Sequence, residues 1–268
     1  MTRRLVGVAN AAWIWESALV GTLLGLSALA WLVTGQLSAP EMQHGLLTGG
    51  AASMAPMSSG AGSVPMLGLF LLTWVVMMVA MMFPSVAPVV VTFDRWVRRT
   101  RPSRWATILF VGGYLAVWAV SGLVVYAAIA YLSPLLPMGE GALRWGGGLL
   151  VLAGAYQLTP LKRVCLRHCH SPLAFVAQHT MQLRRGGVSA GRVGAIHGVY
   201  CLGCCWALML VLALLGMMSL AWMAAVAAVI FLEKVLPRGP LVSRAVALLL
   251  IAVGFALVVS PHGFPSLV

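Results

Sequence analysis

Long apolar stretches alternate with short polar, proline-rich or arginine-rich segments along the whole chain. A helix needs about 20 mostly apolar residues to cross a hydrocarbon core that is about 30 Å thick. Windows of this kind predict seven membrane-spanning helices, of which the fourth and sixth are short, so a bundle of six spans is the alternative. The predicted spans are Ser17–Val33, Met66–Val91, Trp105–Leu132, Trp145–Leu158, Ala195–Leu215, Leu220–Val235 and Val246–Val259.

The composition agrees with a membrane protein. Of the 268 residues, 61% are apolar and 8% are charged. Since about a quarter of the residues in a soluble domain are charged, most of this surface must face lipid instead of water. The predicted fold class is therefore an all-α polytopic transmembrane helix bundle that forms a single membrane domain over residues 1–268.

Basic residues gather on one side of the predicted bundle. If the N-terminus is cytoplasmic, 16 of the 17 Lys and Arg residues fall in cytoplasmic segments, and only Arg144 lies outside. This asymmetry matches the positive-inside rule and indicates a cytoplasmic N-terminus, an exterior C-terminus and a bacterial inner (cytoplasmic) membrane. The basic loops account for the net charge of +12, so no nucleic-acid partner is expected.

Two segments between the spans contain metal-binding side chains. Residues 38–63 are rich in Gly, Ser and Ala and predict a flexible exterior Met/His loop. Methionine and histidine remain competent ligands where thiols would oxidise. Residues 159–193 are the longest polar stretch and predict a cytoplasmic Cys/His basic loop. The exterior segment holds Met42, His44, Met54 and Met57.

The second predicted span carries four methionines. Met77, Met78, Met81 and Met82 recur at i, i+1, i+4 and i+5, which places them on one stripe of a helix. Thioether sulfur is a soft ligand that favours Cu(I). For this motif alone, flexible packing of an interhelical gap is the stronger interpretation. Pro84 removes a backbone hydrogen bond beside them, which neighbouring helices must replace.

The fifth predicted span has the sharper pattern. His197, Cys201, Cys205 and Met209 follow one another at four-residue spacing, and Cys204 lies beside this row. Four soft ligands on one helical face favour Cu(I) binding. The alternative is that the cysteines pack as small hydrophobes and the histidine bonds a carbonyl. Zinc is a weaker candidate than copper because one helix face rarely closes a tetrahedral shell.

Two further cysteines lie in the polar segment. Cys165 and Cys169 are one helical turn apart, and His170 follows the second. A cytosolic position favours reduced thiols over a disulfide, and these side chains are further candidate metal ligands. A solvated basic loop that happens to contain two cysteines is the alternative. Basic neighbours should lower the thiol pKa and favour thiolate: Lys162, Arg163 and Arg167.

Charged residues inside the predicted spans are Glu16 and the adjacent Glu233 and Lys234. Charge within a membrane is costly. Positions near helix ends, an ion pair between neighbours or a long side chain that reaches the interface explain all three, so structural roles are expected.

The motifs in this order resemble the DUF2182 family of predicted metal-binding integral membrane proteins, some of which are labelled copper chaperones. The resemblance covers about Met66 to Lys234 and implies that the metal is copper. His170 departs from it, because a basic residue is expected after the second cysteine of the polar segment. The motifs that carry it are Trp74 to Pro84, Ala153 to Lys162 leading to Cys165 and Cys169, Cys201 to Met209, and Glu233-Lys234.

The sequence therefore predicts a metal-binding integral membrane protein that handles Cu(I) as a chaperone, delivery protein or transporter. Its expected partners are the lipid bilayer, the metal ion and a client metalloenzyme or soluble metal carrier. Enzymatic activity is not expected, because no phosphate-binding loop, carboxylate pair or catalytic triad is visible. A thiol-redox membrane protein and a structural or assembly subunit, packed through glycines of the fourth span, are the alternatives.

A shared site between two spans is the most specific expectation. Cys201, Cys205 and Met209 should face the bundle interior opposite Met77 and Met81, because both sets lie near the middle of their spans. A thiolate that faces lipid would be penalised, whereas one that faces a partner helix can be neutralised by the metal. His197 should then lie toward the cytoplasmic end of this site.

Overall fold

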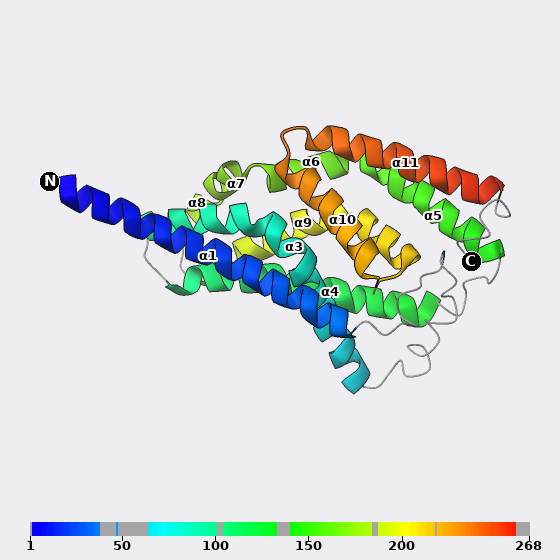
Figure 1. Cartoon of the computed structure of the whole chain (residues 1–268), viewed down its shortest axis with the longest axis horizontal. Helices are drawn as coiled ribbons and strands as arrows, with labels where there is room; N and C mark the ends of the chain where they lie inside the picture. Colours follow the sequence, from blue (N-terminus) through cyan, green and yellow to red (C-terminus); the bar gives the residue numbers. More distant parts are fainter. Residues whose placement is uncertain are drawn as a thin grey trace.

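The structure is a computed structural model that describes residues 2–37, 47, 64–100, 104–132, 140–183, 187–217 and 219–260. Every regular element in these ranges is a helix, which confirms the all-α prediction for them (Figure 1). The longer helices are α1 (Thr2–Leu37), α3 (Val64–Thr100), α4 (Arg104–Leu132), α5 (Glu140–Leu158), α9 (Gly187–Leu215), α10 (Leu220–Val235) and α11 (Gly239–Val259).

Within the described residues, five helices are long and apolar enough to cross a membrane, so the chain is an integral membrane protein. They lie in α1, α3, α4, α9 and α11. The short windows predicted as the fourth and sixth spans correspond to α5 and α10. α10 has 16 residues, and α5 has 19 residues that include Glu140 and Arg144.

A proline in α3 explains how α1 packs against it. Pro84 lies inside the helix and has no N–H to donate to the carbonyl of Ala80. Ser27 Oγ and Trp31 Nε1 of α1 donate to that oxygen instead, at 2.7 and 3.0 Å. An unpaired carbonyl in a membrane costs several kcal/mol, so α1 supplies the replacement that the sequence requires.

Glycines let α4 and α9 pack with their backbones in contact. A Cβ on Gly113 would overlap the carbonyl oxygen of Gly191, and a Cβ on Gly194 would overlap that of Phe110. Small residues allow membrane helices to approach this closely. The contact sets the position of Tyr114, which follows Gly113 on α4, beside the cysteines of α9.

The polar segment between α5 and α9 is helical over most of its length, although its composition predicts a loop. It forms α6 (Pro160–His170), α7 (Pro172–Gln178) and α8 (Thr180–Leu183). Thr159 caps α6, since its Oγ1 accepts a hydrogen bond from the backbone N–H of Lys162 at 3.3 Å, and Pro160 occupies the first turn. α6 packs along α9.

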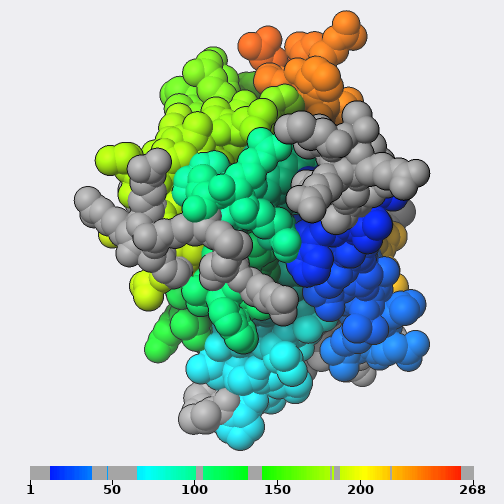
Figure 2. Space-filling model, turned by 90° about the vertical axis from the view of Figure 1, so that its left-hand side faces the viewer, coloured from blue at the N-terminus to red at the C-terminus, as the bar shows by residue number. Residues whose placement is uncertain are grey.

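Seen from the side of the N-terminal helix, α1 lies beside α3, and the α6–α8 segment lies next to the end of α3 (Figure 2). Of the predicted exterior Met/His loop, only Leu47 is within the described residues. Its backbone N–H donates to Leu214 O at 3.0 Å, and its side chain is buried against Gly146 of α5.

Candidate metal centre

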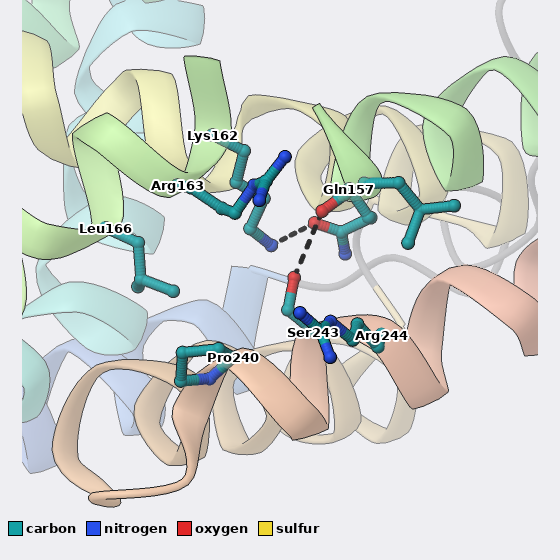
Figure 3. Close-up of a pocket in the computed structure, with 8 residues that line it drawn as sticks. Gln157, Lys162, Arg163, Leu166, Pro240, Ser243 and Arg244 are labelled. Carbon is teal, nitrogen blue, oxygen red and sulfur yellow. Dashed lines mark hydrogen bonds between the residues drawn. The ribbon is translucent and has the colours of Figure 1, made fainter. Parts of the chain in front are cut away.

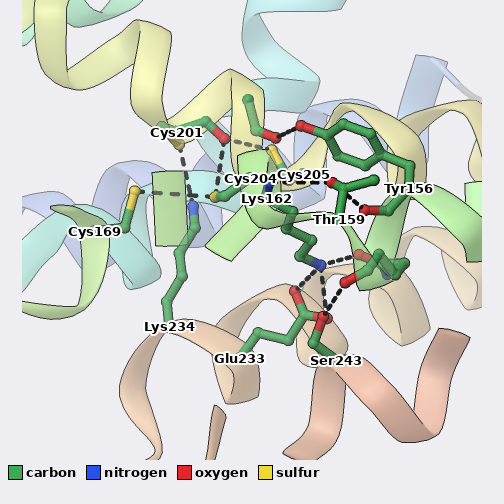
Figure 4. Close-up of polar contacts among 12 residues, drawn as sticks. Tyr156, Thr159, Lys162, Cys169, Cys201, Cys204, Cys205, Glu233, Lys234 and Ser243 are labelled. Carbon is green, nitrogen blue, oxygen red and sulfur yellow. Dashed lines mark hydrogen bonds and ion pairs between the residues drawn. The ribbon is translucent and has the colours of Figure 1, made fainter. Parts of the chain in front are cut away.

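The closest pair of thiols joins α6 to α9. Cys169 Sγ and Cys204 Sγ are 3.9 Å apart (Figure 4). Two sulfur ligands that bind one metal ion at about 120°, each with a bond of about 2.3 Å, lie about 4.0 Å apart. The pair therefore has the spacing of two ligands of one ion. All five cysteines are free and buried: Cys165, Cys169, Cys201, Cys204 and Cys205.

The three cysteines of α9 are held together by the helix backbone. Cys204 Sγ and Cys205 Sγ lie 3.1 and 3.0 Å from the carbonyl oxygen of Cys201 and donate to it. Tyr114 OH lies 3.2 Å from Cys201 Sγ. Cys165 packs on the same helix, because a Cβ on Gly203 would come within 2.7 Å of its sulfur. Cys201, Cys204, Cys205 and Cys165 therefore lie around Gly203. Together with Cys169 they form the thiol cluster.

The five thiols are not arranged around a single metal position. Among the described residues, no group of three or more His, Cys, Asp or Glu side chains is arranged to hold a metal ion. Cys169 and Cys204 supply two ligands without rearrangement, whereas Cys201 and Cys205 would have to rotate away from their present partners. The donor set therefore fits a soft ion that accepts few ligands better than it fits a closed tetrahedral zinc shell.

Lys234 of α10 extends into this cluster. Its Nζ lies 3.1 Å from Cys201 Sγ. Ser85 Oγ and Met82 Sδ of α3 lie 3.4 and 3.8 Å from the same nitrogen. The residue is buried, and no carboxylate among the described residues pairs with it. A buried ammonium without an acidic partner is costly, and thiolates are the anions within reach that can balance it.

Glu233 has a different partner from its neighbour. Its carboxylate oxygens accept hydrogen bonds from Lys162 Nζ of α6 at 2.7 and 2.9 Å, and both side chains are almost fully buried. Gln157 Oε1 also accepts from Lys162. The sequence-based interpretation of Glu233 and Lys234 as an adjacent ion pair or as snorkelling residues is wrong, because consecutive helix residues do not face each other. Glu16, by contrast, has the expected structural role in an ion pair with Arg95.

The basic residues of α6 do not lower the pKa of its two thiols, contrary to the prediction from the sequence. The hydrogen bond to Cys204, together with burial, raises the pKa of Cys169 well above its usual value. Burial raises the pKa of the Cys165 thiol. The expected lowering fails because Lys162 is paired with a carboxylate and the two arginines of α6 are exposed. Metal binding to these thiols must therefore displace their protons.

Two predicted histidine ligands lie outside the cluster. The buried ring of His197 is surrounded by aromatic rings, and its Nδ1 has no hydrogen-bond partner among the described residues. His170 Nδ1 donates to the backbone oxygen of Lys234 at 2.8 Å, so it holds the end of α10. The rings around His197 belong to Phe175, Tyr114 and Phe110, at centroid distances of 4.9, 6.0 and 6.2 Å.

The four methionines of α3 are buried, but α3 does not pack directly along α9, as the predicted shared site would require. α3 packs chiefly on α1 and α4, and α9 packs chiefly on α4. The sulfur of Met82 and the sulfur of Cys201 contact the same nitrogen, Lys234 Nζ, at 3.8 and 3.1 Å. Met209 is partly buried against the same core. Met77, Met78 and Met81 pack in this core as well.

Sequence reasoning missed Lys234, Tyr114 and Ser85 as neighbours of the thiols. One signal was available for Lys234, because an ionisable residue within a membrane helix is by default a functional candidate. No pattern pointed to Tyr114 or Ser85, since their contacts depend on how α4 and α3 pack around α9 and α10.

The fold and the site define a helical integral membrane protein with a buried thiol cluster suited to a soft metal ion. The family model described as PpoB2 copper chaperone matches residues 71–257, so the chain belongs to this family. The match includes all the thiols and both buried lysines. No curated protein and no solved structure matches the chain.

Proposed function

We propose that this protein binds Cu(I) as its cargo at the thiol cluster and passes it to a client metalloenzyme or a soluble carrier. The observation that carries the proposal is the pair of buried sulfur atoms of Cys169 and Cys204, 3.9 Å apart between α6 and α9. Thiolates favour soft ions such as Cu(I) and also bind zinc, and membership of a copper chaperone family supports copper over zinc. The proposed role is binding and transfer, without a catalytic step.

Cys169 and Cys204 are the proposed primary ligands. Cys201 is the third, after it releases its contact with Lys234, and Met82, whose sulfur lies 3.8 Å from the same lysine nitrogen, is the proposed thioether neighbour. The thiolates of Cys169 and Cys204 and one Cu(I) carry a net charge of −1, and Cys201 as a neutral thiol leaves this charge unchanged. The Lys234 ammonium brings the loaded cluster to neutrality, which matters because an uncompensated buried charge is costly.

The test is the copper content of protein purified with reductant under anaerobic conditions. We expect the wild type to retain copper and Cys169→Ser and Cys204→Ser to lose it, because each removes one of two primary ligands. Met209→Leu is the matched control, since this sulfur lies on the same helix but outside the contacts. Equal copper retention by the serine variants would contradict the proposal.

A thiol-redox role is the second candidate, since the same two sulfur atoms are close enough to form a disulfide after a small movement. Oxidation would join Cys169 to Cys204 and pass two protons and two electrons to the disulfide of a partner protein, which would be reduced to two thiols. Alkylation of the purified protein without reductant separates the two functions. Because both thiols are buried, the reagent is added to the denatured protein. Copper binding predicts that both thiols are alkylated after the metal is removed, whereas a redox role predicts a disulfide that resists alkylation.

Two glycines of α5 do not require an external partner. Gly147 lies against the backbone of Gly254, and Gly154 lies against Ala247 of α11. For these two glycines, the close packing that favoured an assembly subunit is therefore explained within the chain, whereas a Cβ at Gly148 would meet nothing within 4 Å. Because these pairs run in opposite order, α5 lies antiparallel to α11. This packing supports the proposal that α5 crosses the membrane too and that the bundle has seven spans.

A further inference from the structure

A cavity of about 230 Å³ lies between the end of α5, the start of α6 and the first turns of α11 (Figure 3). The thiol cluster does not include it, and copper binding does not use it. Its volume is below the range of about 300 to 1,000 Å³ that holds drug-sized ligands, so it suits a small group. Its polar lining comes from Gln157, Lys162, Arg163, Ser243 and Arg244.

Each polar side chain around this cavity carries a hydrogen-bond donor, and no acidic residue is among the described residues that line it. Lys162 is neutralised by Glu233, and the Ser243 hydroxyl donates to Gln157 O at 3.4 Å. Three donors remain without a hydrogen-bond or ion-pair partner in the described part of the chain. They are Gln157 Nε2, which is buried, and the guanidinium groups of Arg163 and Arg244, which are exposed.

These donors favour an anion with several oxygen acceptors. The two arginines supply two uncompensated positive charges, and guanidinium groups bind phosphate through paired hydrogen bonds. The first turns of α6 and α11 also meet at the cavity, where the helix dipoles favour negative charge. Phosphate is the common biological anion that matches this charge and size.

We propose that this cavity binds the phosphate group of an anionic phospholipid. The rest of its lining is apolar and consists of Leu158, Leu166 and Pro240, which suits the glycerol and the start of the acyl chains. The basic residues that line the cavity come from segments that the positive-inside rule places on the cytoplasmic side. Basic pockets between membrane helices on that side bind lipid headgroups.

The bound lipid would contact both α6 and α11. A single ion pair, Lys162 with Glu233, links this cavity to the helix turn that carries Lys234. Lys162 lines the cavity and pairs with Glu233, which precedes Lys234 on α10. The site therefore lies where it can hold α6, and with it Cys169, against the bundle. Phospholipid binding itself does not depend on the copper proposal.

The full chain, delipidated in neutral detergent, tests this by native mass spectrometry and by thermal unfolding followed through tryptophan fluorescence. The probes are phosphatidylglycerol, phosphatidylcholine and inorganic phosphate. We expect phosphatidylglycerol to remain bound and to raise the melting temperature, and phosphatidylcholine to do neither. The double variant Arg163→Gln and Arg244→Gln should bind phosphatidylglycerol at least about tenfold more weakly, since it loses charge-assisted hydrogen bonds.

The matched control is the double variant Arg192→Gln and Arg238→Gln, which removes the same charge from exposed positions that do not line the cavity. It should bind phosphatidylglycerol as the wild type does. Equal weakening in both double variants would show a general charge effect and overturn the site. Stabilisation by inorganic phosphate with none by phosphatidylglycerol would overturn the lipid as the source of the phosphate.

Discussion

Lys234 is the residue at which the thiol cluster differs most from a packed core. It is buried, it touches the Cys201 sulfur, and the carboxylate next to it in sequence is committed to Lys162. A packing role for the cysteines would give no reason to bring an ammonium group to them. A metal-binding role does, because thiolates and a lysine cation stabilise one another in a low dielectric medium.

Replacement of this lysine tests its charge. Lys234→Leu removes the charge, leaves an apolar side chain and adds no metal ligand, so we expect Cu(I) affinity to fall by about tenfold or more because the loaded cluster keeps a net negative charge. Lys234→Arg keeps the charge and should retain most of the affinity. Competition with a Cu(I) chelator measures both. An unchanged affinity in the leucine variant would show that copper binding needs no counter-charge.

At the scale of elements, the sequence predicted the long apolar helices, the cysteine row of α9, and Cys165 and Cys169 as candidate ligands. It did not predict that these two cysteines lie on a helix, α6, that packs along α9. Hydropathy windows detect apolar helices, and α6 is polar on one side and buried on the other. Local signals were present, since Thr159 and Pro160 mark a helix start and Cys165 and Cys169 share a face. Their approach to Cys204 depends on tertiary packing, which no local pattern encodes.

The packing of α6 on α9 requires a small residue at Gly203. A side chain there would meet the sulfur of Cys165, so Gly203→Val should push α6 outward and separate Cys169 from Cys204. We expect copper retention to fall while the protein remains folded. Gly112→Val on α4 is the control, because a Cβ at Gly112 meets nothing within 4 Å. If both variants retain copper equally, the position of α6 does not control the site.

At the scale of the whole molecule, contacts between helices indicate the relative directions of several of them. α4 and α9 run in the same direction, since Phe110 meets Gly194 and Val117 meets Gly198. Two parallel spans need a crossing between them, and α5 is the long helix that separates them in sequence. α10 runs against α1, because its first residue, Leu220, lies near Gly35. Seven alternating crossings agree with these directions.

Accessibility of single positions to a membrane-impermeant thiol reagent tests the seven crossings. With seven spans and a cytoplasmic N-terminus, a cysteine introduced by Met217→Cys lies outside and one introduced by Arg167→Cys lies inside. If α5 and α10 do not cross, the two positions exchange sides. The native cysteines are buried, so the unmodified protein gives the background. We expect labelling from the exterior at position 217 only, because the basic residues around position 167 favour the cytoplasmic side, and labelling at position 167 only would refute the seven-span bundle.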